Sequence, residues 1–270
     1  MTPEEYHASD GLSNSMMNKL LKSPAHMKYY MDNPDPSTPA QVLGTQAHTA
    51  LLEPGSWKGV RGVEGDRRTK AVKEQHLQQV EEHGAENIIK PDAFDQIEGI
   101  VSSVLANPTA ASIIRSAQDD GQIEDSLFWI DHRTHVECKA RVDCVPGHSS
   151  MYSTCLADFK TTVDASPESF AKSVLNFGYA RQAAHYLSGW NHLNPEDERS
   201  MFVIIACEKS PPYAVAIYEL DWKALELGNY EVENLLELYA QCENEGKWGA
   251  YPETIQMLEL PAWATARIGQ

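Results

Sequence analysis

The chain has 270 residues, of which 42% are hydrophobic and 23% are charged, as is usual for a folded soluble protein. The formal net charge of −17 argues against a general nucleic-acid coat protein, because binding phosphate requires local positive charge. It does not exclude a nuclease, since an acidic pocket suits a divalent cation and a basic channel can coexist with an acidic exterior.

The N-terminal residues 1–20 lack the basic segment and apolar run of a signal peptide. No stretch of the sequence approaches the ~20 apolar residues that span a membrane. The five cysteines show no paired short spacings, which indicates free thiols in a reducing compartment. We therefore expect a cytoplasmic protein without a membrane-bound part.

Residues 1–121 are expected to be mainly helical. Apolar residues recur at helical spacing in segments that caps, prolines or a glycine delimit. These segments are 13–32 (interrupted at Pro24), 39–54, 66–84 and 91–108. Residues 56–66 are expected to form a loop.

The pattern changes to strands at about residue 122. Short β-branched or aromatic runs at 123–131, 135–146 and 153–163 predict three successive antiparallel strands. A helix over 166–193, two strands at 201–209 and 214–220, and a closing helix over 221–248 follow. This order predicts an α/β fold, with a central mixed sheet flanked by helices and an N-terminal helical elaboration. We expect one domain over 1–270, with its catalytic sheet in 122–270.

Polar residues that could take part in catalysis lie on two successive strands of this sheet. Asp158 and Lys160 are two apart and face the same side, while Phe159 faces the packing on the other. Asp143 lies one hairpin earlier, before a turn at 146–147, and is expected beside Asp158. Two crowded carboxylates repel unless a cation lies between them. Mg²⁺ with a nearby ammonium suits phosphodiester hydrolysis, although an Asp-x-Lys tripeptide occurs by chance about once in such a chain.

With these residues in place, the sequence resembles the restriction-endonuclease-like PD-(D/E)xK nucleases. The similarity is greatest to the RecB-like branch and its RecE-like members, typified by the C-terminal nuclease domain of exodeoxyribonuclease VIII. The resemblance covers nearly the whole chain and implies a restriction-endonuclease-like core. Five segments in the family's order carry it: 12–30, 43–54, 123–143, 179–186 and 251–263.

The resemblance implies a role for each matched residue. Asp143 and Asp158 would be metal ligands, together with His48 and the backbone carbonyl of Phe159. Lys160 would be the catalytic lysine. The residues that would position the attacking water or the nucleic-acid strand are Glu124, Gln182 and Tyr186. Mg²⁺ would be the cofactor, and Mn²⁺ would substitute for it.

Simpler interpretations exist for several of these residues. His48 on an apolar helix is compatible with ordinary packing, and Asp158 with Lys160 could form an exposed ion pair. Asp143 could be a turn residue. Glu124 could face solvent, and Tyr186 could pack under the sheet. A neighbouring branch of the family holds an iron–sulfur cluster through one early and three late cysteines; this spacing is absent from the sequence, so no cluster is expected.

The densest basic cluster lies in the predicted third helix. It consists of Arg67, Arg68, Lys70 and Lys73. Charge runs are usually solvated helix faces. The alternative is a helix that grips phosphate at the mouth of a DNA channel.

The resemblance implies a Mg²⁺-dependent exonuclease that acts on the ends of linear double-stranded DNA. Digestion from the 5′ end would leave 3′ single strands for annealing, in phage-type recombination or repair. A single-strand annealing protein would be the partner, and a trimeric or tetrameric ring the assembly. Two alternatives remain: a related nuclease of other polarity or an endonuclease, and a DNA-binding module with a degenerate site.

Overall fold

The computed structural model describes residues 1–66 and 68–260. Its centre is a five-stranded sheet of strand order β3-β4-β5-β6-β7. The strands are β3 (Gln122–Ile130), β4 (Glu137–Val145), β5 (Cys155–Thr162), β6 (Met201–Glu208) and β7 (Val215–Glu219). β5 and β6 pair in parallel and the other neighbours are antiparallel, which confirms the predicted mixed sheet.

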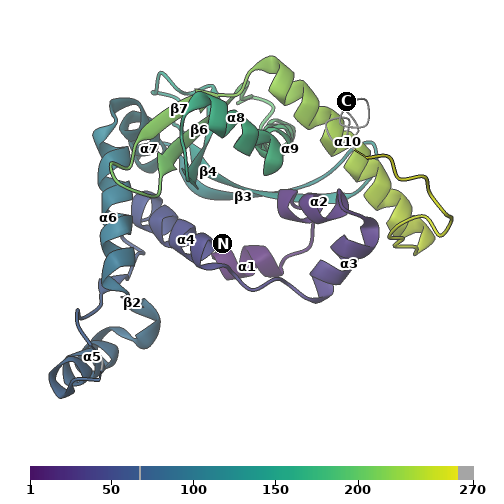
Figure 1. The fold of residues 1–270 in the computed structure, drawn as a ribbon. Coiled ribbons are helices and arrows are strands. Elements are labelled where there is room, and N and C mark those ends of the chain that lie inside the picture. The colour runs from purple at the N-terminus through teal and green to yellow at the C-terminus, as the bar shows by residue number, and fades with distance from the viewer. Residues whose placement is uncertain (67, 261–270) are drawn as a thin grey trace, which may run out of the picture.

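Helices surround the sheet, as predicted (Figure 1). In the first half they are α1 (Pro3–Ala8), α2 (Asn14–Leu20), α3 (Pro24–Asp32), α4 (Pro39–Leu52), α5 (Lys70–His83), α6 (Pro91–Ala106) and α7 (Pro108–Asp119). In the second half they are α8 (Pro167–Asn176), α9 (Tyr179–Leu193) and α10 (Trp222–Glu245). A short 3₁₀ helix, η1 (Ala85–Asn87), precedes β2 (Ile88–Ile89), which pairs in parallel with β1 (Val60–Arg61).

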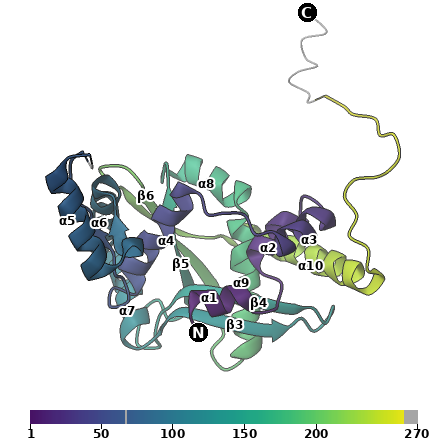
Figure 2. The ribbon, with the colours of Figure 1, turned by 90° about the horizontal axis from the view of Figure 1, so that it is seen from below.

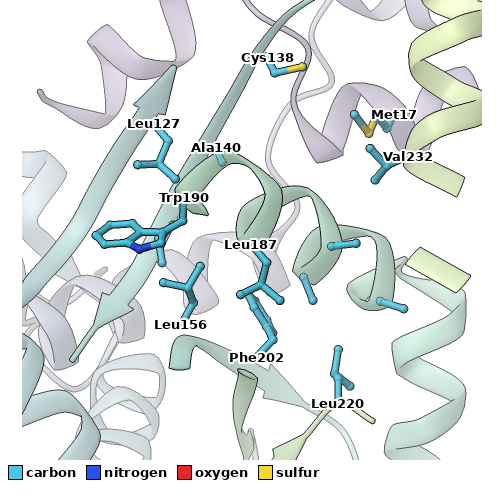
Figure 3. Close-up of a cluster of buried hydrophobic side chains, with 14 of the residues drawn as sticks. Met17, Leu127, Cys138, Ala140, Leu156, Leu187, Trp190, Phe202, Leu220 and Val232 are labelled. Atoms are coloured by element: carbon cyan, nitrogen blue, oxygen red, sulfur yellow. The ribbon is translucent and has the colours of Figure 1, made fainter. Parts of the chain in front are cut away.

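Each face of the sheet packs into its own hydrophobic core. On one face, side chains such as Leu156 and Phe202 pack with α2, α3, α8, α9 and α10 (Figure 3). On the other face, Phe159 and Ile205 pack with α4, α6 and α7. Consecutive residues of β5 and β6 thus enter opposite cores, as the period of two in a strand requires. This double coverage holds the centre of β5 rigidly between two layers.

β4 and β5 diverge, and this opens the sheet at its centre. Their ladder contains the single partner pair Cys144↔Ala157, whereas β3 and β4 pair along most of their length. The freed edge of β4 pairs with the N-terminal segment instead: the Leu12 N–H donates to the Glu137 carbonyl over 2.8 Å. The predicted hairpin therefore exists, but its strands meet only near Asp143 and Asp158.

Two helices were not predicted. Pro108 was interpreted as the end of a helix, but it is the first residue of α7. Proline is favoured at that position, because the backbone N–H it lacks has no partner there. The Asn107 side chain accepts the N–H groups of Thr109 and Ala110, each over 3.1 Å. The same arrangement begins α1, where Thr2 is the cap and Pro3 follows it.

The helix predicted over 166–193 is two helices. Gly178 adopts φ +68° between α8 and α9, a left-handed conformation that glycine adopts without steric cost. The break turns α9 across the sheet, so that Arg181, Gln182 and His185 are all buried. The continuous pattern of apolar residues concealed this change of direction.

Two parts of the chain extend from the body. α5 has no buried residue and lies with β2 at the far end of α6 (Figure 1). At the other end, residues 249–260 leave α10 as an extended segment (Figure 2). Within the described residues, no single helix has the length and apolar character of a membrane span; only α6 and α7 taken together, bent by 94°, would satisfy that criterion.

Candidate active site

The divergence of β4 and β5 brings Asp143 against the backbone of the Asp-x-Lys strand. The Phe159 N–H donates to Asp143 Oδ2 over 2.7 Å. In a continuous ladder this N–H would bond to a β4 carbonyl. The Asp143 side chain therefore replaces a main-chain partner, and its position is fixed relative to both Asp158 and Lys160.

Glu124 lies on β3 opposite Asp143. The register pairs Ile123 with Cys144 and Asp125 with Val142, and the ladder is interrupted between them. There Glu124 adopts φ +54°, which is uncommon for a residue with a side chain. Like charges directly opposite on neighbouring strands are destabilising, so this placement requires positive charge nearby.

His48 supplies that charge from α4, on the opposite side of the gap. Its Nδ1 lies 2.8 Å from Glu124 Oε1, and its Nε2 lies 2.7 Å from Asp143 Oδ2. One ligand atom from each of these residues falls within 4.8 Å of the other two, as a shared metal ion requires. Apolar neighbours on α4, Ala47 and Leu51, are buried in the core and fix the face of the helix that His48 occupies.

Asp158 and Lys160 face α9, as the strand alternation predicts. Asp158 Oδ2 lies 2.5 Å from Lys160 Nζ, and Asp158 Oδ1 accepts a hydrogen bond from the Gln182 side-chain amide over 2.7 Å. Asp158 is only 1% exposed. It is not one of the three residues whose ligand atoms cluster within 4.8 Å, so its carboxylate is turned toward Lys160 and Gln182.

The charges of the site are strongly coupled. Burial favours the neutral His48 ring, but Asp143 and Glu124 outweigh it and raise the pKa of His48 to about 10. Burial and the charge of Asp143 raise the pKa of Asp158 to about 6. Burial also opposes the charge of Lys160, yet Asp158 and Asp143 raise its pKa above the ordinary value. Lys160 is therefore a permanent cation at neutral pH.

A buried oxygen of Glu124 indicates that these residues fit a divalent cation. Within the described residues, Glu124 Oε1 and Asp158 Oδ2 are buried and accept no regular hydrogen bond; each lies against a positive group instead, His48 and Lys160 respectively. A buried polar atom without such a bond is unfavourable. Carboxylate oxygens are the ligands that Mg²⁺ prefers, so a cation between His48, Glu124 and Asp143 would satisfy Glu124 Oε1, whereas Asp158 Oδ2 lies against the Lys160 ammonium.

Two further predicted residues, Phe159 and Tyr186, also lie near Asp143 or on the cavity beside it. The N–H and the carbonyl of a strand residue point to the same edge, so the Phe159 carbonyl also faces Asp143. Tyr186 is half-buried and lines a cavity of about 900 Å³. Gln182, Glu124 and Asp143 also line this cavity, which extends to α1, α2 and α3.

The predicted basic cluster lies away from these residues. Arg68, Lys70 and Lys73 are exposed at the start of α5, and they do not line the cavity. α5 protrudes from the body (Figure 1). Arg67, and residues 261–263 of the tail segment, lie outside the described residues.

Sequence reasoning missed two residues. Arg141 lies two positions before Asp143, lines the cavity and contacts Glu124. Tyr179 places its ring 5.2 Å from Lys160 Nζ. A signal for Arg141 was present, because residues two apart on a strand share a face.

The fold and the residues gathered at its centre are those of the PD-(D/E)xK nuclease class. Residues 13–261 match the model of the PDDEXK-like domain of unknown function (DUF3799), and the chain belongs to this family. Its fold is similar to the crystal structure of a proposed exonuclease from Eubacterium rectale, with a TM-score of 0.60 and 13% identity over 99% of this chain and 97% of that one. This likeness shows a shared fold. No curated protein matches the chain.

Proposed function

We propose that the protein is a Mg²⁺-dependent exodeoxyribonuclease that hydrolyses linear double-stranded DNA. The observation that carries the proposal is the meeting of Asp143 with Asp158 and Lys160 where β4 and β5 diverge. Family membership supports the nuclease class. Digestion from the 5′ end, 3′ tails for strand annealing, and action in phage-type recombination or repair rest on the RecE-like resemblance.

Each residue of the site has a role that its contacts or the family resemblance support. The clustered ligand atoms support His48 and Asp143 as ligands and add Glu124 to this set. The family resemblance adds Asp158 and the Phe159 carbonyl, which would complete the cation site. When bound, the cation would supply Lewis-acid activation of water and offset charge on the phosphate. Histidine binds a metal ion as the neutral imidazole, so the protonated His48 ring would release one proton when it binds the ion.

Lys160 and α9 act on the other side of the gap. A lysine that keeps its proton is unsuited to be a base, so we assign the Lys160 ammonium to stabilise negative charge that develops on the phosphate oxygens. Gln182 holds Asp158 in one orientation through its 2.7 Å hydrogen bond. Tyr186 lines the cavity beside it and would contact the nucleic-acid strand.

The proposal also covers the oligomeric state, the cellular location and the partner protein. A trimeric or tetrameric ring would surround DNA with a basic bore, which is compatible with an acidic exterior and a net charge of −17. Arg67, Arg68, Lys70 and Lys73 would contact phosphate. We expect a cytoplasmic enzyme that works with a single-strand annealing protein. Light scattering of the purified chain tests the ring, and a monomer would contradict it.

Digestion of linear and covalently closed duplexes tests the function. With Mg²⁺, we expect linear DNA to be degraded, a 5′ label to be released before a 3′ label, and closed circles to survive. Early release of the 3′ label would indicate the opposite polarity. Cleavage of closed circles would replace the exonuclease with an endonuclease.

Asp158→Ala tests the mechanism in the same assay. We expect complete loss of hydrolysis with DNA binding largely kept, because the variant removes a ligand without changing the surface. Asp119→Ala is the matched control, since Asp119 is exposed on α7, and its activity should equal that of the wild type. Undiminished digestion by Asp158→Ala would remove the proposed mechanism, and a wild type that binds but never cleaves DNA would favour a binding module.

A further inference from the structure

Arg141 is a half-buried cation that contacts Glu124 directly. Its Nε contacts Glu124 Oε2 in an ion pair, and its Nη1 donates to Ser126 Oγ over 3.1 Å. Ser126 is the register partner of Arg141 on β3, so the guanidinium reaches diagonally along the pair of strands. Both charged side chains are nearly buried, with 12% of Arg141 and 11% of Glu124 exposed.

The N-terminal helix covers Arg141 and restricts its movement. Arg141 Nη1 donates to the Met1 carbonyl over 3.2 Å, and the guanidinium lies 5.9 Å from the centre of the Tyr6 ring. α1 is itself held by Lys139, whose Nζ donates to the carbonyls of Tyr6 and Ser9 over 3.1 and 2.6 Å. The arginine is therefore fixed on both sides before any ligand binds.

Glu124 needs such a support because its backbone is in an unfavourable conformation. A residue with a side chain at φ +54° is unfavourable and persists only where its surroundings hold it there. Its carboxylate also lies opposite that of Asp143, which repels it. The contact with Arg141 engages Oε2 only, and Oε1 is left without a hydrogen bond, 2.8 Å from His48 Nδ1.

We infer that Arg141 is a positioning residue, which holds Glu124 with Oε1 turned toward His48 and Asp143 and so completes the cation site. The inference rests on the proposed function and adds a residue to it that acts through Glu124. Groups that orient ligands in this way typically change metal affinity about 10- to 100-fold when they are removed. Lysine cannot reproduce the role fully, because it lacks the planar fork that contacts Glu124 and Ser126 together.

Calorimetric titration with Mn²⁺ tests the inference without relying on activity. The proteins compared are the wild type, Arg141→Gln, Glu124→Gln and the double variant. We expect Arg141→Gln to bind Mn²⁺ about tenfold or more weakly, and Arg141→Lys to be intermediate. Because Arg141 acts through Glu124, Arg141→Gln should change the affinity less than about twofold when Glu124→Gln is already present.

A control removes an exposed arginine–carboxylate ion pair elsewhere. Arg61 contacts Asp95 through Nε over 2.7 Å on the protruding β1 segment, and Arg61→Gln should leave Mn²⁺ affinity unchanged. Thermal unfolding without metal shows whether each variant is folded. If Arg141→Gln fails to fold, the Mn²⁺ affinity of Arg141→Lys is compared with and without Glu124→Gln instead.

The outcomes separate this inference from the proposed function. A wild type that binds no Mn²⁺ overturns both. Normal Mn²⁺ affinity in folded Arg141→Gln, or equal losses with and without Glu124→Gln, overturns the positioning role alone. Weaker DNA binding in the absence of metal, with Mn²⁺ affinity intact, would assign Arg141 to the substrate instead.

Discussion

At the scale of single residues, the site depends on carboxylates that are placed too close together for an apolar interior. Glu124 and Asp143 lie opposite each other on β3 and β4, and Asp158 is buried beside them. His48 and Lys160 bring positive charge from opposite sides of the gap. Gln182 donates a hydrogen bond to Asp158 and so holds one of these carboxylates in place.

Lys160→Met tests the electrostatic role of the lysine. Methionine fills similar space without charge, so we expect hydrolysis to fall by about 100-fold or more, while Mn²⁺ binding persists because no ligand is lost. Digestion of end-labelled linear duplex measures the rate. Lys172→Met removes an exposed lysine that pairs with Glu168 on α8, and it should digest DNA at the wild-type rate. Equal activity in Lys160→Met would exclude the lysine from the reaction.

At the scale of elements, α9 connects the site to the core. It carries Gln182 to Asp158, and three residues later its His185 Nε2 lies 3.2 Å from the Lys139 carbonyl on the free edge of β4. Arg181 joins the same helix to α2 and α10 through Asn14 and Glu231. The direction of α9 therefore determines the geometry of Asp158.

The break before α9 can be tested at Gly178. A Cβ there would lie 2.1 Å from Arg181 Nη2, so Gly178→Ala combines backbone strain with a clash against a buried ion pair. We expect a loss of about 2–4 kcal/mol in unfolding free energy, measured by urea denaturation. Gly246→Ala is the control, because Gly246 has a similar φ of +63° but open space around it; its loss should be about 1 kcal/mol. Equal losses would show that Arg181 relaxes freely.

His185 makes the contact between α9 and β4 sensitive to acid. Burial lowers its pKa from 6.5 to about 4. The unfolded chain then binds an extra proton between these values, and stability falls as the pH falls through this window. From pH 7 to pH 5 the loss from this group is about 2 kcal/mol. Urea denaturation at both pH values should show a smaller decrease for His185→Gln than for the wild type, and parallel decreases would contradict the assignment.

At the scale of the whole molecule, an acidic chain has to approach a polyanion. The exposed cations at the start of the protruding α5 are the surface proposed for this contact. Each phosphate contact contributes about −0.9 to the slope of log affinity against log salt concentration. Replacing three cations by glutamine should therefore weaken DNA binding and reduce the magnitude of that slope by up to about 3. The triple variant consists of Arg68→Gln, Lys70→Gln and Lys73→Gln.

A control variant with the same change in net charge separates the effect of the α5 surface on DNA binding from the effect of total charge. It combines Lys28→Gln, Lys172→Gln and Lys223→Gln, which are exposed on α3, α8 and α10. Its salt slope should match that of the wild type in fluorescence anisotropy with labelled duplex. If the two triple variants behave alike, α5 is a solvated helix face and not a DNA contact.

Much of this architecture could be predicted from local patterns. The five strands and the mixed sheet follow from short β-branched runs, and the alternation along β5 placed Asp158 beside Lys160. The helix boundaries at Pro108 and Gly178 were predicted wrongly. A proline can begin a helix as well as end one, and a glycine can change the direction of the chain between two helices without interrupting the apolar pattern.

The rest of the site depended on non-local geometry. The positive φ of Glu124 and the partial pairing of β4 with β5 arise from contacts between distant segments, and no short motif encodes them. For Arg141 the spacing from Asp143 was a local signal, but its contact with Glu124 on the neighbouring strand was not. The extent of the single domain, and the roles of the site residues, remain predictions.

The proposed mechanism requires Asp143 and Asp158 to bind one divalent ion between them. Anomalous diffraction from a crystal soaked in Mn²⁺ would locate that ion. We expect a peak at the gap between β4 and β5, within coordination distance of Asp143 and of Asp158. A fully soaked crystal without a peak there, with the two carboxylates directed away from each other, would contradict it.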